Sequence, residues 1–148
     1  MPVTRIAKTA LLPYAAEQLF DLVNDIAAYP QYMEGCVAAT VLSASSEQVE
    51  ARLELSRGGI TQSFATRNRL QRPEVIEMAL LEGPFTALSG RWQFLVLGEE
   101  ACKVSLDLRF ELDGKLASIA AGRLFESVAS NLVDALCRRA HTVLGAAV

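Results

Sequence analysis

The chain has 148 residues and a formal net charge of −3, with a sequence pI of about 5.2. This length suits one domain with a substantial buried core. The acidic balance argues against a dedicated nucleic-acid binder, which usually has a domain pI above about 9. Hydrophobic residues make up 51% of the chain, yet no apolar run approaches the ~18 residues of a membrane span. The surplus apolar surface is therefore expected inside the fold or around a ligand.

The N-terminus and the cysteines bear on the cellular compartment. The first twelve residues carry Arg5 and Lys8 and lack an apolar stretch followed by a small-residue cleavage site, so we expect a cytoplasmic protein. Cys36, Cys102 and Cys137 are widely spaced and form no CxxC motif. This odd number of scattered cysteines indicates neither a disulfide framework nor a zinc cluster, and we expect small buried side chains.

The N-terminal part of the chain predicts a strand followed by short helical structure. A strand is expected around residues 3–11, and Pro13 suits the first turn of a helix because its fixed φ and missing N–H cost nothing there. Apolar residues then recur at helical spacing at Leu19, Phe20, Val23 and Ile26, and Pro30 ends any continuation.

Residues 49–70 predict a β-hairpin. Apolar residues at 49, 51, 53 and 55 alternate with polar ones, and Gly58 and Gly59 supply a turn before the return strand. Gln62, Thr66 and Asn68 share the parity of the apolar residues in the return strand, so we expect them to point inward. A buried amide or hydroxyl needs a partner, within the protein or in a ligand carbonyl, unless a bulge turns it outward.

Three further strands are expected before the C-terminal region. Residues 74–82 predict one strand, which Gly83 and Pro84 end. The next strand carries Leu88, Gly90, Trp92, Phe94 and Val96 on one face, and the glycine within it suggests a kink or bulge that lets the sheet curve. Residues 102–112 alternate apolar and polar side chains, so one face of that strand must meet water.

The C-terminal region predicts one long amphipathic helix after a turn at Asp113 and Gly114. An apolar stripe steps by four residues through Leu116, Ala120, Leu124, Val128, Leu132, Leu136 and Ala140. This helix is the long apolar element left to cover the apolar face of the antiparallel sheet. We therefore predict an α+β fold, one domain over residues 1–148, whose curved sheet wraps the helix around a cavity or a filled core.

Several strings in the sequence resemble one known family. Residues 22–36 (LVNDIAAYPQYMEGC) are similar to the signature of the coenzyme Q-binding protein family, which includes the bacterial ribosome association toxin RatA. The strings FATRN (64–68), GPF (83–85), GRWQF (90–94) and GRLF (122–125) follow in the family's order. The resemblance covers nearly the whole chain, and it implies the helix-grip fold of START-like, polyketide cyclase-like proteins.

The resemblance implies a hydrophobic cavity that holds ubiquinone or a similar prenylated or lipid-like molecule without chemistry on it, and no further cofactor. The main prediction is therefore a carrier of a hydrophobic small molecule that supports cellular respiration, with transient contact at a membrane surface. Bacterial members also block the association of ribosomal subunits. The alternative prediction is thus a RatA-type regulator whose partner is a ribosomal subunit, and no DNA partner is expected.

The predicted ligand contacts lie on the apolar side of the sheet and of the last helix, and in the loop before residue 36. They are Tyr32, Met33, Leu53, Leu55, Gln62, Phe64, Met78, Leu80, Trp92, Phe94, Leu106, Phe110, Phe125, Val128 and Leu132. Two positions depart from the family pattern. Met33 and Glu34 replace Leu and Pro, which predicts a less rigid loop, and Ala15 replaces a capping Ser at a cost of roughly 1 kcal/mol to the first helix.

Two other groups of residues leave alternatives open. Arg67 and Arg69, with Arg57 and Arg72 nearby, are a candidate contact with ribosomal RNA or simply a solvated strand face. Cys137 and His141 are four residues apart on the predicted helix, like a metal pair or a nucleophile with its base. No further ligand or orienting group is apparent, so no metal site is predicted.

A third prediction, a polyketide cyclase-like enzyme, is weaker. Such an enzyme needs a general acid or base inside the cavity. No strand position that is expected to point inward carries such a group. The strand carboxylates Asp107, Glu111, Glu50 and Glu54 all lie at positions expected to point outward. We therefore expect a protein that is not an enzyme.

Overall fold

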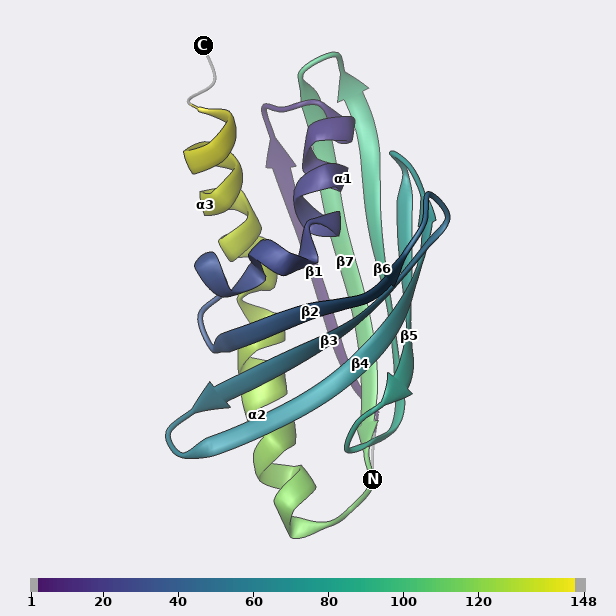
Figure 1. Cartoon of the computed structure of the whole chain (residues 1–148). Helices are drawn as coiled ribbons and strands as arrows, with labels where there is room; N and C mark the ends of the chain where they lie inside the picture. The colour runs from purple at the N-terminus through teal and green to yellow at the C-terminus, as the bar shows by residue number, and fades with distance from the viewer. Residues whose placement is uncertain (1–2, 146–148) are drawn as a thin grey trace.

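The structure is a computed structural model that describes residues 3–145, apart from the side chains of residues 116–118. Within these residues a seven-stranded sheet curves around the C-terminal helices (Figure 1). The elements in chain order are β1 (Thr4–Leu12), α1 (Ala16–Asn24), the 3-10 helix η1 (Ile26–Gln31), β2 (Cys36–Ala44), β3 (Gln48–Arg57), β4 (Ile60–Gln71), β5 (Val75–Glu82), β6 (Phe85–Gly98), β7 (Ala101–Leu112), α2 (Leu116–Ser130) and α3 (Leu132–Leu144).

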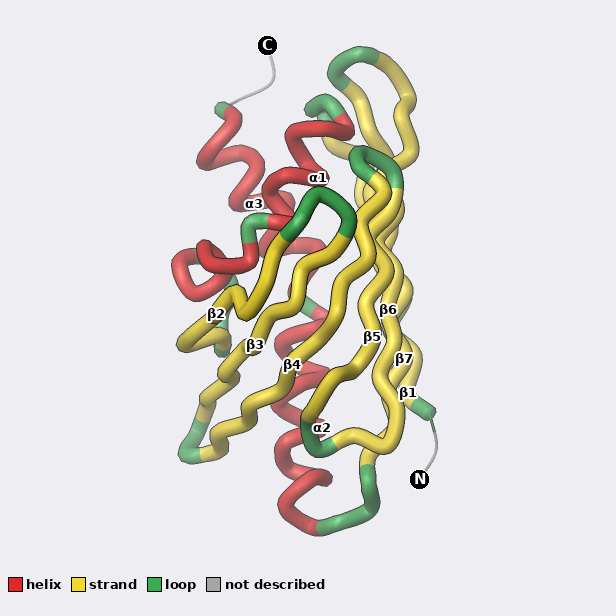
Figure 2. The backbone as a smooth tube through the Cα atoms, turned by 45° about the vertical axis from the view of Figure 1, so that its right-hand side comes forward, coloured by secondary structure: helices red, strands yellow, loops and turns green. Residues whose placement is uncertain are grey.

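The strand order is β1-β7-β6-β5-β4-β3-β2, and the neighbouring strands are antiparallel. Strands β2 to β6 each pair with the next strand along the chain, whereas β1 pairs with β7. The described helices all lie on the concave side of the sheet, and its convex face is bare (Figures 1 and 2). This arrangement confirms the predicted α+β helix-grip fold.

The predicted hairpin of β3 and β4 is confirmed. Val49, Ala51 and Leu55 are buried on the concave face, as the alternation requires. The two glycines of the turn have φ values of 59° and 82°, which side-chain-bearing residues rarely adopt. The glycine pair therefore sets the register of this hairpin.

Strand β2 was not identifiable from the sequence pattern. It forms a free edge of the sheet, and its pairing with β3 shifts register twice, between Cys36 and Ala38 and between Val41 and Ser43. Most of its residues are exposed. An edge strand with two irregularities loses the period of two on which strand prediction depends.

The first helix begins later than predicted. Pro13 and Tyr14 form a bend, and α1 starts at Ala16. The capping position is Ala15, whose side chain makes no capping bond, although its backbone N–H donates to Oε1 of Gln18 at 3.2 Å. This contact is half of a capping box and partly replaces the missing side-chain cap.

The prediction of one long C-terminal helix was wrong, because the helix breaks at Asn131. This residue has φ −99° and ψ 0°, and its backbone N–H bonds to Val128 rather than continuing the helical ladder. Its side-chain Nδ2 donates to the carbonyl of Ser127 at 2.8 Å. An Asn side chain that competes for backbone carbonyls favours such an interruption. The apolar stripe continues across the break, since Leu124, Val128, Leu136 and Ala140 are buried; the side chain of Leu116 lies outside the described residues.

The bulge expected at Gly90 was also wrong. The pairing of β6 is regular there, and its register shifts lie between Phe85 and Ala87 and between Val96 and Gly98. A Cβ atom at Gly90 would lie 2.6 Å from Met78 Cε. The glycine therefore makes room for a neighbouring side chain. Val96 keeps the parity of Trp92 and lies opposite the buried Cys102, but it is 55% exposed near the end of the hairpin.

The aromatic core consists of two groups. Phe64, Phe85, Phe110 and Phe125 pack edge to face, with ring centroids 4.9 to 6.0 Å apart, and connect α2 to the sheet. Phe94 packs against Phe20 of α1 and stacks on Trp92. Such pairs stabilise a core beyond the burial of their area.

Candidate functional site

An interior cavity lies between the concave face of the sheet and the helices. Its free volume is about 70 Å³. Its wall includes residues on both sides of the helix break at Asn131. The lining residues are Ile26, Tyr29, Met33, Ala51, Leu53, Leu55, Phe64, Thr66, Asn68, Met78, Leu88, Gly90, Trp92, Leu108, Phe125, Val128, Ala129 and Leu132.

The structure brings nine of the fifteen predicted ligand contacts together around this cavity. They are Met33, Leu53, Leu55, Phe64, Met78, Trp92, Phe125, Val128 and Leu132. The other six, Tyr32, Gln62, Leu80, Phe94, Leu106 and Phe110, do not line it. Phe94 and Phe110, for example, contact other aromatic rings instead. Inward parity identifies the core, but it does not separate the cavity wall from packed residues.

Nine lining residues were absent from the predicted set: Ile26, Tyr29, Ala51, Thr66, Asn68, Leu88, Gly90, Leu108 and Ala129. Parity had predicted that Thr66 and Asn68 face inward, and this orientation is confirmed. Ala51, Leu88 and Gly90 also share the parity of the apolar faces predicted for their strands. Tyr29 gave no such signal. The position of η1 against the cavity depends on packing between distant segments, which no local pattern encodes.

Two polar side chains stand out on the apolar interior. Asn68 is 6% exposed, and its Oδ1 accepts a hydrogen bond from the Thr66 hydroxyl at 3.0 Å, so its Nδ2 group remains a donor at the cavity wall. Gln62 is 4% exposed, and neither its Oε1 nor its Nε2 has a hydrogen-bond partner. A buried polar group without a partner typically costs about 1–3 kcal/mol. These amides are the features of the interior that favour a ligand.

The titratable groups near the cavity are tyrosines. Burial raises the pKa of Tyr29, which lines the cavity, well above its ordinary value, and its hydroxyl donates to the carbonyl of Val23. Burial likewise raises the pKa of Tyr32 to about 12, although the guanidinium of Arg139 lies 5.1 Å from its ring centroid and opposes the shift. In the described part of the wall there is no carboxylate, imidazole or amine. A proton-transfer step inside this cavity would have to use a phenol that stays protonated at neutral pH.

Cys137 and His141 do not form a larger cluster. Desolvation raises the pKa of the Cys137 thiol, and His141 lies exposed in the last turn of α3. Among residues 3–145, no group of three or more His, Cys, Asp or Glu side chains is placed to hold a metal ion. A pair of ligands is too few for a protein zinc site.

The convex face of the sheet carries charges in register across the strands. Glu50 lies opposite Arg67, Glu77 lies between Arg69 and Arg91, and Arg91 lies opposite Asp107. Opposite charges paired across strands stabilise a sheet modestly. Several of these residues also form ion pairs in the structure, including Arg67 with Glu50 and Arg91 with Glu77.

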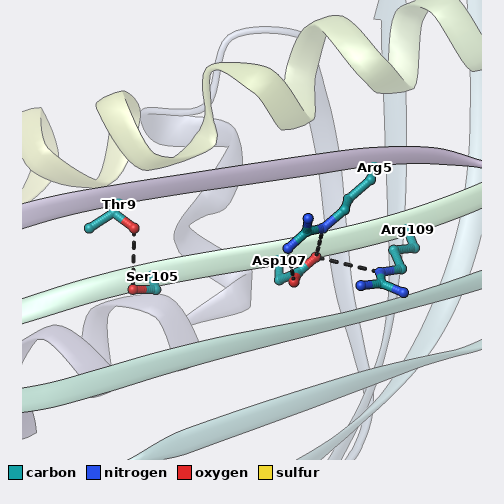
Figure 3. Close-up of polar contacts among 5 residues, drawn as sticks. All are labelled: Arg5, Thr9, Ser105, Asp107 and Arg109. Atoms are coloured by element: carbon teal, nitrogen blue, oxygen red, sulfur yellow. Dashed lines mark hydrogen bonds and ion pairs between the residues drawn. The ribbon is translucent and has the colours of Figure 1, made fainter.

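Asp107 is the centre of the charged row on β7 and β1. Arg5 donates to its two carboxylate oxygens at 3.1 and 2.9 Å, and Nε of Arg109 lies 3.8 Å from Oδ1 (Figure 3). The hydrogen bond from Arg5 holds the pKa of Asp107 below its ordinary value. Thr9 and Ser105 join the same two strands nearby at 3.4 Å. The arginines of the convex face therefore have carboxylate partners within reach.

The four arginines considered for ribosomal RNA do not form one patch. Arg57 donates to the Ser127 hydroxyl at 2.8 Å, and Arg72 donates to both carboxylate oxygens of Asp21 at 2.8 and 2.9 Å. Only Arg67 and Arg69 share the convex face of β4. Of the four arginines, only these two therefore remain candidates for a shared contact with RNA.

In the part of the chain that the structure describes, no helix has the length and apolar character needed to cross a membrane.

The chain belongs to the family described as polyketide cyclase / dehydrase and lipid transport, which it matches over residues 12–137. It is 47% identical to the ribosome association toxin RatA of Pseudomonas aeruginosa, over 96% of this chain and 99% of that protein. It is 42% identical to the protein of the same name in Escherichia coli K12, over 96% of this chain and 90% of the relative. A mitochondrial coenzyme Q-binding protein, COQ10 homolog B of Xenopus laevis, is 22% identical, over 94% of this chain and 59% of that protein.

The fold is shared with START-superfamily proteins of known structure. The Zhui aromatase/cyclase of Streptomyces sp. R1128 superposes with a TM-score of 0.83, over 99% of this chain and 98% of that one, at 20% identity. A START superfamily protein of Mycobacterium smegmatis has a TM-score of 0.77, covering 94% of this chain and 98% of the other at 23% identity. At these identities the likeness concerns the fold and not the activity.

Proposed function

We propose that this protein is a ribosome-binding regulator of the RatA type, which binds a ribosomal subunit and blocks the association of the two subunits. The observation that carries the proposal is the 42–47% identity, along 96% of this chain, to proteins named as ribosome association toxins. The coenzyme Q-binding relative, at 22% identity, is far more distant. The alternative prediction from the sequence therefore has better support than the carrier prediction.

The geometry agrees with a role that depends on surface contacts. The interior cavity has a free volume of about 70 Å³, whereas an engineered cavity that binds benzene has about 150 Å³. A prenylated quinone is larger than benzene and would need more space than this cavity offers. The convex face, in contrast, is open to a large partner without any rearrangement (Figure 2).

The test is an association assay with purified ribosomal subunits. Small and large subunits are mixed at a Mg²⁺ concentration that favours association, with and without the protein, and separated on a sucrose gradient. We expect the protein to preserve separate subunit peaks and to co-sediment with one subunit. Adding the protein after association is the control, since a blocking mechanism requires it to act first. Unchanged association, with the protein at the top of the gradient, would refute the proposal.

A second candidate function is the carriage of ubiquinone or a similar apolar molecule with a carbonyl group. The observation that favours it is the pair of buried amides, because Asn68 presents a donor at the cavity wall and Gln62 lacks any partner. A ligand carbonyl is an acceptor that suits such donors. Purified protein would be extracted into organic solvent and the extract identified by mass spectrometry. We expect a prenylated or lipid-like molecule in a fixed ratio to protein, and its absence would count against carriage.

A further inference from the structure

The β6–β7 hairpin ends in exposed apolar side chains. Leu95, Val96 and Leu97 are 57%, 55% and 55% exposed, and Leu11 of the adjacent β1 is 71% exposed. We refer to these four residues as the apolar tip. Leu95 and Leu11 both lie opposite Lys103 of β7, so they stand in one row on the same face of the sheet. The hairpin extends beyond the neighbouring end of α1 (Figures 1 and 2).

The apolar tip has no evident part in the packing of the core. The core in this region ends with Cys102, which lies opposite Val96 and is fully buried. Hairpin ends exposed to water are usually polar, and a cluster of exposed large apolar side chains indicates an interaction site. Exposed leucines of this kind also invite aggregation unless a partner covers them. These features point to an interaction surface at the end of the hairpin.

The charges beside the apolar tip define its partner. Glu99 and Glu100 form the turn itself and therefore meet any partner first, while Lys103 lies at the base between the two leucines. Two adjacent carboxylates at the leading edge disfavour contact with the phosphates of RNA or with an anionic lipid surface. They favour a protein surface that carries Lys or Arg side chains next to an apolar pocket.

We propose that the apolar tip docks into an apolar pocket flanked by cationic side chains on a basic protein of the ribosomal subunit. This inference rests on the proposed ribosome-binding function and adds which surface makes the contact and with which class of component. The leucines supply the apolar contact, and Glu99 and Glu100 pair with the cationic rim. Charge complementarity of this kind sets partner choice and register more than raw affinity.

The test compares two double substitutions in a subunit-binding titration. Replacing Leu95→Ser and Leu97→Ser is expected to weaken binding of the purified subunit by about tenfold, as loss of buried interface anchors typically does. The matched control is Val41→Ser with Leu42→Ser on β2, whose side chains are 42% and 46% exposed. The control is expected to bind like the unmodified protein. Both variants should melt like the unmodified protein, because the substituted side chains lie outside the core.

A charge reversal identifies the class of partner. Glu99→Lys with Glu100→Lys should weaken binding several-fold if the contact is a basic protein, and should tighten it if the contact is RNA, which would overturn the inference. Binding that survives the leucine substitutions also overturns it, while the proposed function stands. If the unmodified protein fails to bind either subunit, the proposed function falls and the inference falls with it.

Discussion

The two faces of the sheet are built on different principles. On the concave face, the choice of residue depends on how the side chains pack together. Trp92 is 2% exposed, and Gly90, two residues before it on the same face, leaves room for Met78. On the convex face, the choice of residue depends on charge. Arg91, next to Trp92 in sequence, pairs with Glu77, and both side chains are about half exposed. Exposed ion pairs add little stability because water competes for each partner. The concave face therefore supplies stability, and the convex face is free to change partners.

The sharpest comparison of the two faces uses these neighbouring residues of β6. Trp92→Ala should lower the free energy of unfolding by about 3–5 kcal/mol, because it leaves a large hole in the core. Arg91→Ala removes one exposed ion pair and should leave the unfolding midpoint almost unchanged. Urea denaturation followed by circular dichroism measures both. Similar losses for the two variants would show that the convex face contributes far more to stability than its exposure suggests.

Substitutions at a matched pair of valines can distinguish the cavity wall from the close-packed core. Val128 lines the cavity, whereas Val133 is 3% exposed and does not line it. Val133→Phe should overpack the core and cost about 1–3 kcal/mol. Val128→Phe should cost less, since the larger ring can use the free volume, and it should abolish binding of ubiquinone if the carrier function exists. Thermal melting and ligand titration test both variants. Equal destabilisation would mean that the cavity offers no usable space.

The unpartnered amide of Gln62 predicts a substitution that stabilises the protein. Gln62→Met keeps a similar length and removes a polar group that has no hydrogen-bond partner. We expect the free energy of unfolding to rise by about 1 kcal/mol. Gln93→Met, at an exposed position of β6, is the control and should change little. A loss of stability in the first variant would reveal a water or ligand that satisfies the amide in the protein as purified.

A modest effect on stability is expected at the arginines of β4. Arg67→Glu with Arg69→Glu places new carboxylates opposite Glu50 and Glu77, both on the solvated face, and folding should be preserved. If these arginines contact ribosomal RNA, co-sedimentation with the subunit should be lost, and binding of the unmodified protein should weaken as salt rises. Gradients at two salt concentrations decide this. Salt-independent binding, or normal binding by the double variant, would exclude Arg67 and Arg69 from the interface.

The sequence predicted those elements whose pattern is local. The alternation in β3, β4 and β7 and the inward orientation of Asn68 follow from the period of two along a strand. The pattern failed at β2, where two register shifts destroy that period. The break at Asn131 depends on one side-chain bond to Ser127 inside an otherwise continuous apolar stripe. Cavity and core residues share the same parity, so only tertiary packing separates Phe125 at the wall from Phe110 behind it.

The pairing of β1 with β7 constrains how the chain can fold during its synthesis. After β2, strands β3 to β7 can add one at a time, because each pairs with the strand made just before it. The first strand must wait, since Thr4 pairs with Phe110, near the end of the sheet. Such a long-range pairing is slow to form because the intervening chain must be ordered first. The newly made N-terminal strand thus stays unpaired until almost the entire chain has left the ribosome that produces it.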